Sequence, residues 1–151
     1  MIAVARPEDR FNDLSLEFVR ELRALGVGIT VASPIFLELA KAVQLRGVES
    51  VLAILQAVDR YGIELATPDP ARLLALVDRY ISLRAMGTKY QFDLLHYASA
   101  TLLSCSHLAS WDKDHFNERI AKKVNRANSS MNLPTLKVGD PASLGRSLGL
   151  G

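Results

Sequence analysis

Three acidic side chains lie in segments that are otherwise mostly apolar. Glu38 lies in Ser-Pro-Ile-Phe-Leu-Glu-Leu-Ala, Asp93 lies in Gln-Phe-Asp-Leu-Leu-His-Tyr-Ala, and Asp112 ends Leu-Ala-Ser-Trp-Asp. A carboxylate in apolar surroundings is costly unless it is paired, hydrogen-bonded or bound to a metal. Mg²⁺ and Mn²⁺ prefer oxygen ligands, and they assist hydrolysis by neutralising the charge that grows on a phosphodiester. The three acids therefore predict a divalent-metal site for hydrolytic phosphoryl transfer.

Each acid also has an ordinary structural interpretation when it is taken alone. Glu38 could lie on the solvent side of an amphipathic helix, and the positive end of a helix macrodipole could stabilise Asp93. Asp112 could be a turn residue that caps the following helix. The three acids come from different segments, each near the end of a predicted strand or the start of a predicted helix. This joint placement is what favours a shared site.

Several neighbours of the acids have roles that the sequence leaves open. His96 follows Asp93 by three positions, so it either orients Asp93 or a substrate phosphate, or is a partly buried histidine. Asp114 is either a fourth acid of the site or a solvated turn residue. His115 either supports the acids or lies on the surface, and Phe116 is predicted to pack in the core.

A basic group follows the acids at Arg119, Lys122, Lys123 and Arg126. On a helix these side chains would cover one broad face, which could hold an RNA backbone beside the acids through charge attraction. A solvated helix face is the alternative. The formal net charge of +2 permits nucleic-acid binding without requiring it.

Hydrophobic periodicity predicts the helices and strands that must position these residues, and glycine and proline mark where these elements begin and end. The predicted helices span residues 8–25, 33–46, 49–60, 71–85, 91–104 and 117–125. The predicted strands span residues 27–31, 63–66, 107–110 and 136–138. Strands that alternate with helices are typical of an α/β layered domain with a mainly parallel sheet. Ligands of such sheets bind beyond the carboxyl ends of the strands, where Asp112 is expected.

Length and composition indicate an ordinary globular chain. The 151 residues, of which 49% are hydrophobic and 23% charged, predict a single domain over residues 1–140 and a flexible tail over residues 141–151. No run of eighteen apolar residues and no basic-then-apolar leader is present, so we expect neither a membrane span nor a signal peptide. The single cysteine, Cys105, favours a reducing, cytoplasmic location.

The segment from Phe92 to Phe116 resembles the C-terminal half of PIN domains. An aspartate opens an apolar, alanine-rich helix, and a strand then leads into Ser-Trp-Asp112, with the pair His115-Phe116 shortly after it. The segment around Glu38 resembles the part of the family that carries a second acid on a helix after a strand. The resemblance covers about residues 3–138.

The resemblance implies a PIN-like three-layer sandwich, with a mainly parallel central sheet flanked by helices. It implies a metal-dependent endoribonuclease that hydrolyses single-stranded RNA, with Glu38, Asp93 and Asp112 as the catalytic residues that bind Mg²⁺ or Mn²⁺. The size of the chain suits a VapC-type toxin of a toxin–antitoxin pair. An antitoxin protein and a second copy of the chain are the protein partners that this implies.

The sequence departs from the family pattern at its N-terminal end. The family begins with a strand that leads into Asp-Thr or Asp-Ser, and this chain has no such element. A start further upstream in the gene or real divergence would each explain the difference. An alternative function is therefore a catalytically inactive PIN-like module that binds protein or RNA. An unrelated α/β phosphohydrolase or receiver-like domain ranks lower. Those folds often carry paired acids after the first strand, and the N-terminal part of this sequence offers no acids after a strand.

Overall fold

The computed structural model of the chain describes residues 11–37, 40 and 48–150. Contacts between Cα atoms divide the chain into two compact units. One unit comprises residues 67–144, and the other comprises Met1–Ala66 with Gly145–Gly151. Each unit contains its own two-stranded sheet and its own buried side chains. The prediction of a single domain over residues 1–140 is not tested by this division and stays a prediction.

Two helices and a parallel strand pair of the first unit are described along their whole length. The elements are α2 (Asn12–Ala24), β1 (Thr30–Ala32), α4 (Val48–Arg60) and β2 (Glu64–Ala66). Thr30 lies opposite Glu64 in the parallel register of β1 and β2. Both helices end at a glycine with positive φ, Gly26 at 69° and Gly62 at 55°, where a side chain would be strained. These glycines turn the chain directly towards the next strand.

The helix predicted at residues 33–46 is described in part. Residues 35–37 and residue 40 are helical, so the beginning of the prediction is confirmed. Glu38, which the sequence assigns to the metal site, lies outside the described residues.

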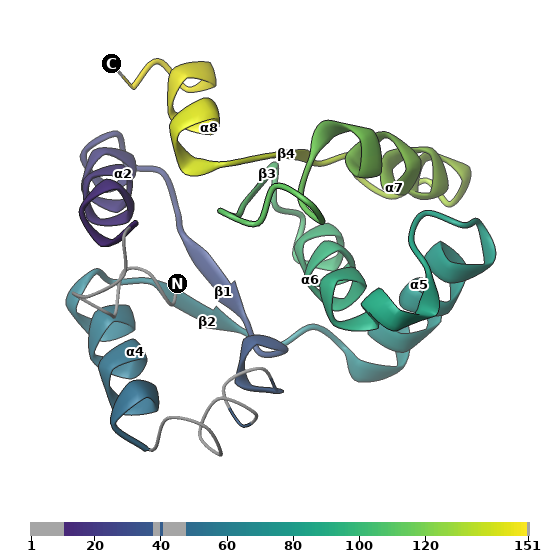
Figure 1. The fold of residues 1–151 in the computed structure, drawn as a ribbon, viewed down its shortest axis with the longest axis horizontal. Coiled ribbons are helices and arrows are strands. Elements are labelled where there is room, and N and C mark those ends of the chain that lie inside the picture. The colour runs from purple at the N-terminus through teal and green to yellow at the C-terminus, as the bar shows by residue number, and fades with distance from the viewer. Residues whose placement is uncertain (1–10, 38–39, 41–47, 151) are drawn as a thin grey trace. The chain divides into compact units, whose positions relative to one another are not determined.

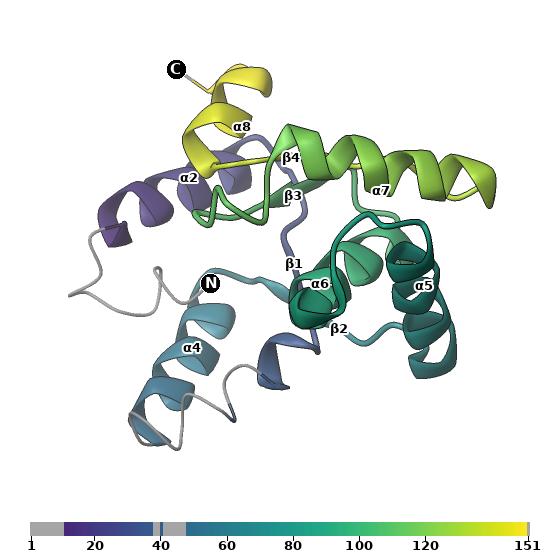
Figure 2. The same ribbon diagram turned by 45° about the vertical axis from the view of Figure 1, so that its right-hand side comes forward.

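The second unit contains the longer run of elements. They are α5 (Pro70–Ser82), the 3₁₀ turn η1 (Thr88–Tyr90), α6 (Gln91–Leu102), β3 (His107–Ala109), α7 (Glu118–Ser130), β4 (Lys137–Gly139) and α8 (Pro141–Ser147), whose last residues belong to the other unit. His107 lies opposite Lys137 in the parallel register of β3 and β4. Figures 1 and 2 show that α5 and α6 lie side by side and that α7 runs beside β4.

One hydrophobic cluster joins the helices and the sheet of the second unit. Its larger members are Leu73, Leu76, Val77, Tyr80, Met86, Leu94, Tyr97, Phe116, Ile120, Val124 and Leu136. Leu94, Tyr97 and Val124 are completely buried, so α6 and α7 are fixed at several points along their length. This cluster is the scaffold that holds the start of α6 and the loop after β3 in place.

A satisfied polar network lies inside the same core. The hydroxyl of Tyr80 donates to Oδ1 of Asn128 at 2.6 Å, and the amide of Asn128 donates to the Thr101 hydroxyl at 3.0 Å. Burial raises the pKa of Tyr80 to about 12, so its hydroxyl remains a donor at neutral pH. A buried network of this kind specifies the packing because each unmade bond would cost about 1–3 kcal/mol.

The α/β class and the parallel strand pairing are confirmed within each unit. Across the stretches of chain that are described, no helix combines the length and the apolar character that a bilayer crossing needs. The helix predicted at residues 117–125 is longer, because α7 extends to Ser130. Residues 141–147, which the sequence places in a flexible tail, form α8. The flexibility of the tail stays a prediction.

Candidate metal-binding site

Two of the three predicted acids come together in the second unit. Asp93 lies in the first turn of α6, and Asp112 lies in the loop that follows β3. A carboxylate oxygen of each, together with a ring nitrogen of His115, lies within 4.8 Å of the others. Asp93 is the more buried acid, with 18% of its side chain exposed against 44% for Asp112. The three side chains form what we call the Asp-Asp-His cluster.

The loop after β3 is folded around the Asp112 carboxylate. Oδ1 of Asp112 accepts the backbone N–H of Asp114 at 3.0 Å and that of His115 at 3.2 Å. The N–H of Asp112 in turn donates to the hydroxyl of Ser110 at 3.2 Å. These short-range bonds are typical of an aspartate that closes a turn on its own side chain. They leave Oδ2 of Asp112 directed towards His115.

Tyr97 fixes this loop to α6. Its hydroxyl donates to the carbonyl of His115 at 3.0 Å, and its ring stacks on Phe116 with 5.2 Å between ring centroids. Burial raises the pKa of Tyr97, so the hydroxyl stays protonated and continues to donate. Because Tyr97 lies one helical turn after Asp93, this anchor sets the separation of the two acids.

His115 is the residue that connects the two carboxylates. Its Nδ1 lies 2.8 Å from Oδ2 of Asp112 and 3.7 Å from Oδ2 of Asp93. The hydrogen bond to Asp112 raises the pKa of His115 above its ordinary value. Partial burial raises the pKa of Asp112, but the hydrogen bonds from the ring and backbone of His115 outweigh it and lower that pKa. The protonated ring therefore attracts both carboxylates, which repel each other.

The donor set of the Asp-Asp-His cluster fits a divalent cation. With metal–ligand bonds of about 2.1 Å, adjacent ligands of an octahedron lie about 3 Å apart and opposite ligands about 4 Å apart. The separations of 2.8 Å and 3.7 Å, and the limit of 4.8 Å over all three atoms, are close to these values. Small side-chain rotations would be enough to bring the three atoms around one ion.

The other residues singled out in the sequence take different positions. Asp114 is exposed and joins the loop through its backbone N–H. The ring of His96 faces the ring of Phe116, with 6.2 Å between centroids, and Phe116 is buried as predicted. Trp111 and Cys105 are half-buried. The sequence did not assign His115 to the metal site, although its position three residues after Asp112 was the available signal.

The basic group on α7 is exposed along its whole length. Its residues Arg119, Lys122, Lys123 and Arg126 are all exposed. Lys122 forms an ion pair with Glu118 at 3.0 Å, and Nζ of Lys123 lies 3.5 Å from the carbonyl of Arg84. The first turn of α7 carries both Glu118 and Arg119, so the positive charge of this helix lies further along it, at Lys122, Lys123 and Arg126.

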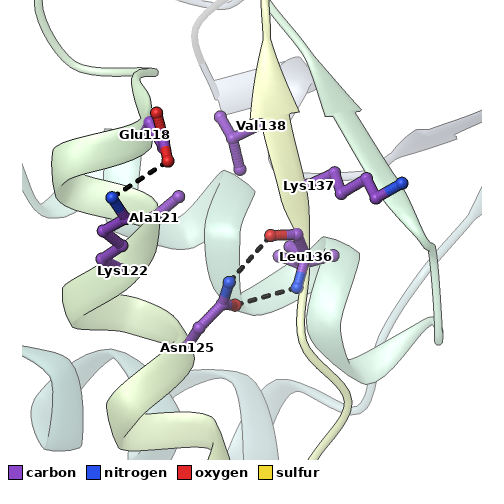
Figure 3. Close-up of a pocket in the computed structure, with 7 residues that line it drawn as sticks. All are labelled: Glu118, Ala121, Lys122, Asn125, Leu136, Lys137 and Val138. Atoms are coloured by element: carbon purple, nitrogen blue, oxygen red, sulfur yellow. Dashed lines mark hydrogen bonds and ion pairs between the residues drawn. The ribbon is translucent and has the colours of Figure 1, made fainter. Parts of the chain in front are cut away.

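A groove of about 360 Å³ lies between α7 and β4, apart from the Asp-Asp-His cluster (Figure 3). Asn125 bridges to β4 there, donating to the carbonyl of Leu136 and accepting its N–H, both at 2.8 Å. Glu118 and Lys122 pair with each other at the rim. Asn125 thus joins α7 to β4 inside the groove, which gives this side chain a structural role.

The chain was compared with family models, curated proteins and solved structures. No family model, no curated protein and no solved structure matches it.

Proposed function

We propose that the chain is a PIN-like, Mg²⁺- or Mn²⁺-dependent endoribonuclease whose metal is held by Asp93 and Asp112. The observation that carries this proposal is the approach of the two carboxylates and a histidine nitrogen to within 4.8 Å of one another. The residues come from the start of α6 and from the loop after β3. That loop lies at the carboxyl end of a parallel strand, where α/β folds place their ligands.

The PIN-like three-layer sandwich is part of the same proposal. Parallel pairing in both small sheets and the alternation of strands with helices support it. Glu38 is proposed as a third acid of the site. The resemblance further suggests a toxin that acts in the cytoplasm, with an antitoxin and a second copy of the chain as protein partners.

Some residues of the site would bind the cation, and others would keep the binding residues in position. Asp93 and Asp112 would hold the cation, while Tyr97 would keep the loop after β3 at a fixed distance from α6. The cation would supply neutralisation of phosphate charge and activation of water. The exposed basic face of α7, including Arg119 and Lys123, would hold the RNA backbone through charge attraction.

An inactive binding module is the second candidate function. Ser33 follows β1 closely and Thr67 follows β2 directly, so neither described strand of the first unit leads straight into an acid. Within the described part of the chain, the cluster contains two carboxylates. A module with this site would bind RNA or protein without cleaving it.

Hydrolysis of end-labelled single-stranded RNA in the presence of Mn²⁺ distinguishes the two functions. Loss of a metal ligand removes several kcal/mol of charge stabilisation, so we expect Asp93→Asn and Asp112→Asn each to lower the cleavage rate by about 10²-fold or more. Asp114→Asn is the matched control, because that exposed carboxylate lies outside the cluster, and it should change the rate by less than about threefold. Binding of RNA without cleavage would instead support the inactive module.

A further inference from the structure

The ring of His115 is oriented by contacts on several sides. Its backbone N–H donates to Oδ1 of Asp112, and its carbonyl accepts the Tyr97 hydroxyl at 3.0 Å. The ring lies against the ring of Tyr90, with 4.6 Å between centroids. The side chain is 31% exposed, so one edge remains open to solvent. The ring is therefore held in one orientation by protein contacts alone.

In this orientation Nδ1 faces the space between the two carboxylates. It lies 2.8 Å from Oδ2 of Asp112 and 3.7 Å from Oδ2 of Asp93. When the proton of the neutral ring is on Nε2, Nδ1 offers a lone pair towards the same space as both carboxylate oxygens. The backbone contacts of His115 would not need to change for this nitrogen to reach a cation there.

A nitrogen ligand changes which cation a site prefers. Carboxylate and water ligands suit Mg²⁺, which keeps several waters and dehydrates reluctantly. Imidazole suits first-row transition metals, whose affinity for nitrogen and oxygen sites rises from Mn²⁺ towards Cu²⁺. An imidazole beside the carboxylates consequently makes a site less suited to Mg²⁺ than carboxylates alone would.

We propose that His115 is a direct metal ligand through Nδ1, and that it makes the site selective for Mn²⁺ or another first-row transition metal over Mg²⁺. This inference rests on the proposed function, because it concerns the same cation. It narrows the predicted choice between Mg²⁺ and Mn²⁺, and it gives His115 a role as ligand in place of the supporting or surface role inferred from the sequence.

The test is the binding of MnCl₂ and MgCl₂ to the full chain, with nitrogen coordination read directly. Electron spin-echo envelope modulation of bound Mn²⁺ detects a coordinated ¹⁴N nucleus and requires no catalytic activity. We expect the native chain to show this signal and His115→Gln to lack it. Loss of the ligand should weaken Mn²⁺ binding by about 10-fold or more while changing Mg²⁺ binding by less than about threefold.

Two further variants make the test specific. His115→Asp supplies an oxygen in place of the nitrogen, so it should still bind metal, lack the ¹⁴N signal, and reduce the preference for Mn²⁺ over Mg²⁺ by about 10-fold. His107→Asn is the matched control, since Nδ1 of His107 pairs with the Ser106 hydroxyl at 2.8 Å, outside the cluster. It should retain both the signal and the preference.

The outcomes separate this inference from the proposed function. Mn²⁺ binding that Asp93→Asn abolishes, without a ¹⁴N signal and with an unchanged metal preference in His115→Gln, would overturn the role of His115 and leave the carboxylate site standing. Absence of metal binding by the native chain would overturn both. Loss of the signal and of the preference in both His115 variants, with His107→Asn unaffected, would establish the ligand.

Discussion

At the scale of single residues, the central feature is a charge pair that can serve two purposes. Protonated His115 lies within 4 Å of both Asp93 and Asp112 and offsets part of their negative charge. In the metal-bound protein, the cation would replace the proton in that role. The same three side chains can therefore hold either a proton on His115 or a cation.

This pair predicts a pH dependence of stability. The pKa of His115 is raised in the folded protein. Its contribution to the free energy of unfolding is therefore fully present below about pH 6.5, and it is lost as the pH rises through the pKa that His115 has in the folded protein. The pKa of Asp112 is lowered, so its contribution is present above about pH 3.8 and is lost as pH falls through the folded pKa. The pair should stabilise the loop most between about pH 4 and 6.5. Because both groups are partly exposed, the effect should stay below about 1 kcal/mol.

Urea unfolding in a metal chelator, at pH 5.5 and at pH 8.5, measures this effect. The native chain should exceed His115→Gln in free energy of unfolding by more at the lower pH. His107→Gln should show the opposite trend, because burial lowers the pKa of His107, with Lys137 adding to the shift. Equal differences for His115→Gln at the two pH values would contradict the charge pair.

At the scale of elements, the start of α7 holds the loop of the site. Oδ1 of Asn117 accepts the N–H of Ile120 at 3.1 Å, which caps the helix. The amide of the same residue donates to the carbonyls of Lys113 at 2.9 Å and Asp114 at 3.0 Å. One side chain thus ties the first turn of α7 to the loop that carries Asp112.

Replacing this cap should affect stability and the site together. Asn117→Ala removes the cap and both donated bonds, so we expect a loss of about 1–2 kcal/mol in the free energy of unfolding. Asn117→Asp keeps the capping acceptor and removes the donors, so it should lose less stability while still loosening the loop. Urea denaturation gives the first quantity, and Mn²⁺ affinity reports the second. A fully stable Asn117→Ala variant would mean that the cap does not hold the loop.

Helix-capping signals occur at two Asp-Pro pairs in the sequence. Asp69-Pro70 predicted the start of α5, and the structure has Asp69 as its N-cap, accepting the N–H of Arg72 at 2.8 Å. Asp140-Pro141 is the same signal, and Asp140 accepts the N–H of Ser143 at 2.9 Å at the start of α8. This helix lies in the segment whose later glycine and leucine residues indicated a flexible tail, so composition alone did not reveal it.

The candidate site could be predicted from the sequence in type but not in geometry. Asp93 and Asp112 were selected from their apolar surroundings, and the structure brings them together. Their separation depends on Tyr97 reaching the carbonyl of His115 and stacking on Phe116, which is tertiary packing that no local pattern encodes. For the same reason, the sequence could not place the ring of His115 between the two acids.

At the scale of the whole molecule, the Asp-Asp-His cluster and the core that supports it lie in one unit. Residues 67–144 contain both, including the Tyr80 network and the cap at Asn117. A chain of that size buries enough surface to fold alone, though with a small margin of stability. The hydrogen bonds that connect Tyr97, Asp112 and His115 lie within this unit.

A fragment of residues 67–147, which keeps α8 complete, should fold and retain the cluster. We expect a cooperative thermal transition by circular dichroism and Mn²⁺ binding that depends on Asp93. A matched fragment with Leu94→Ala should unfold more easily by about 2–5 kcal/mol, because Leu94 is completely buried. A fragment without a cooperative transition would show that the second unit depends on the rest of the chain.

The most direct test of the central claim is titration of the full chain with Mn²⁺ by isothermal calorimetry, beside an Asp93→Asn variant of the same thermal stability. The account predicts one Mn²⁺ per chain for the native protein and a loss of about 10-fold or more in affinity for the variant. Equal binding by both proteins, or no binding by the native chain, would contradict a metal site at Asp93 and Asp112.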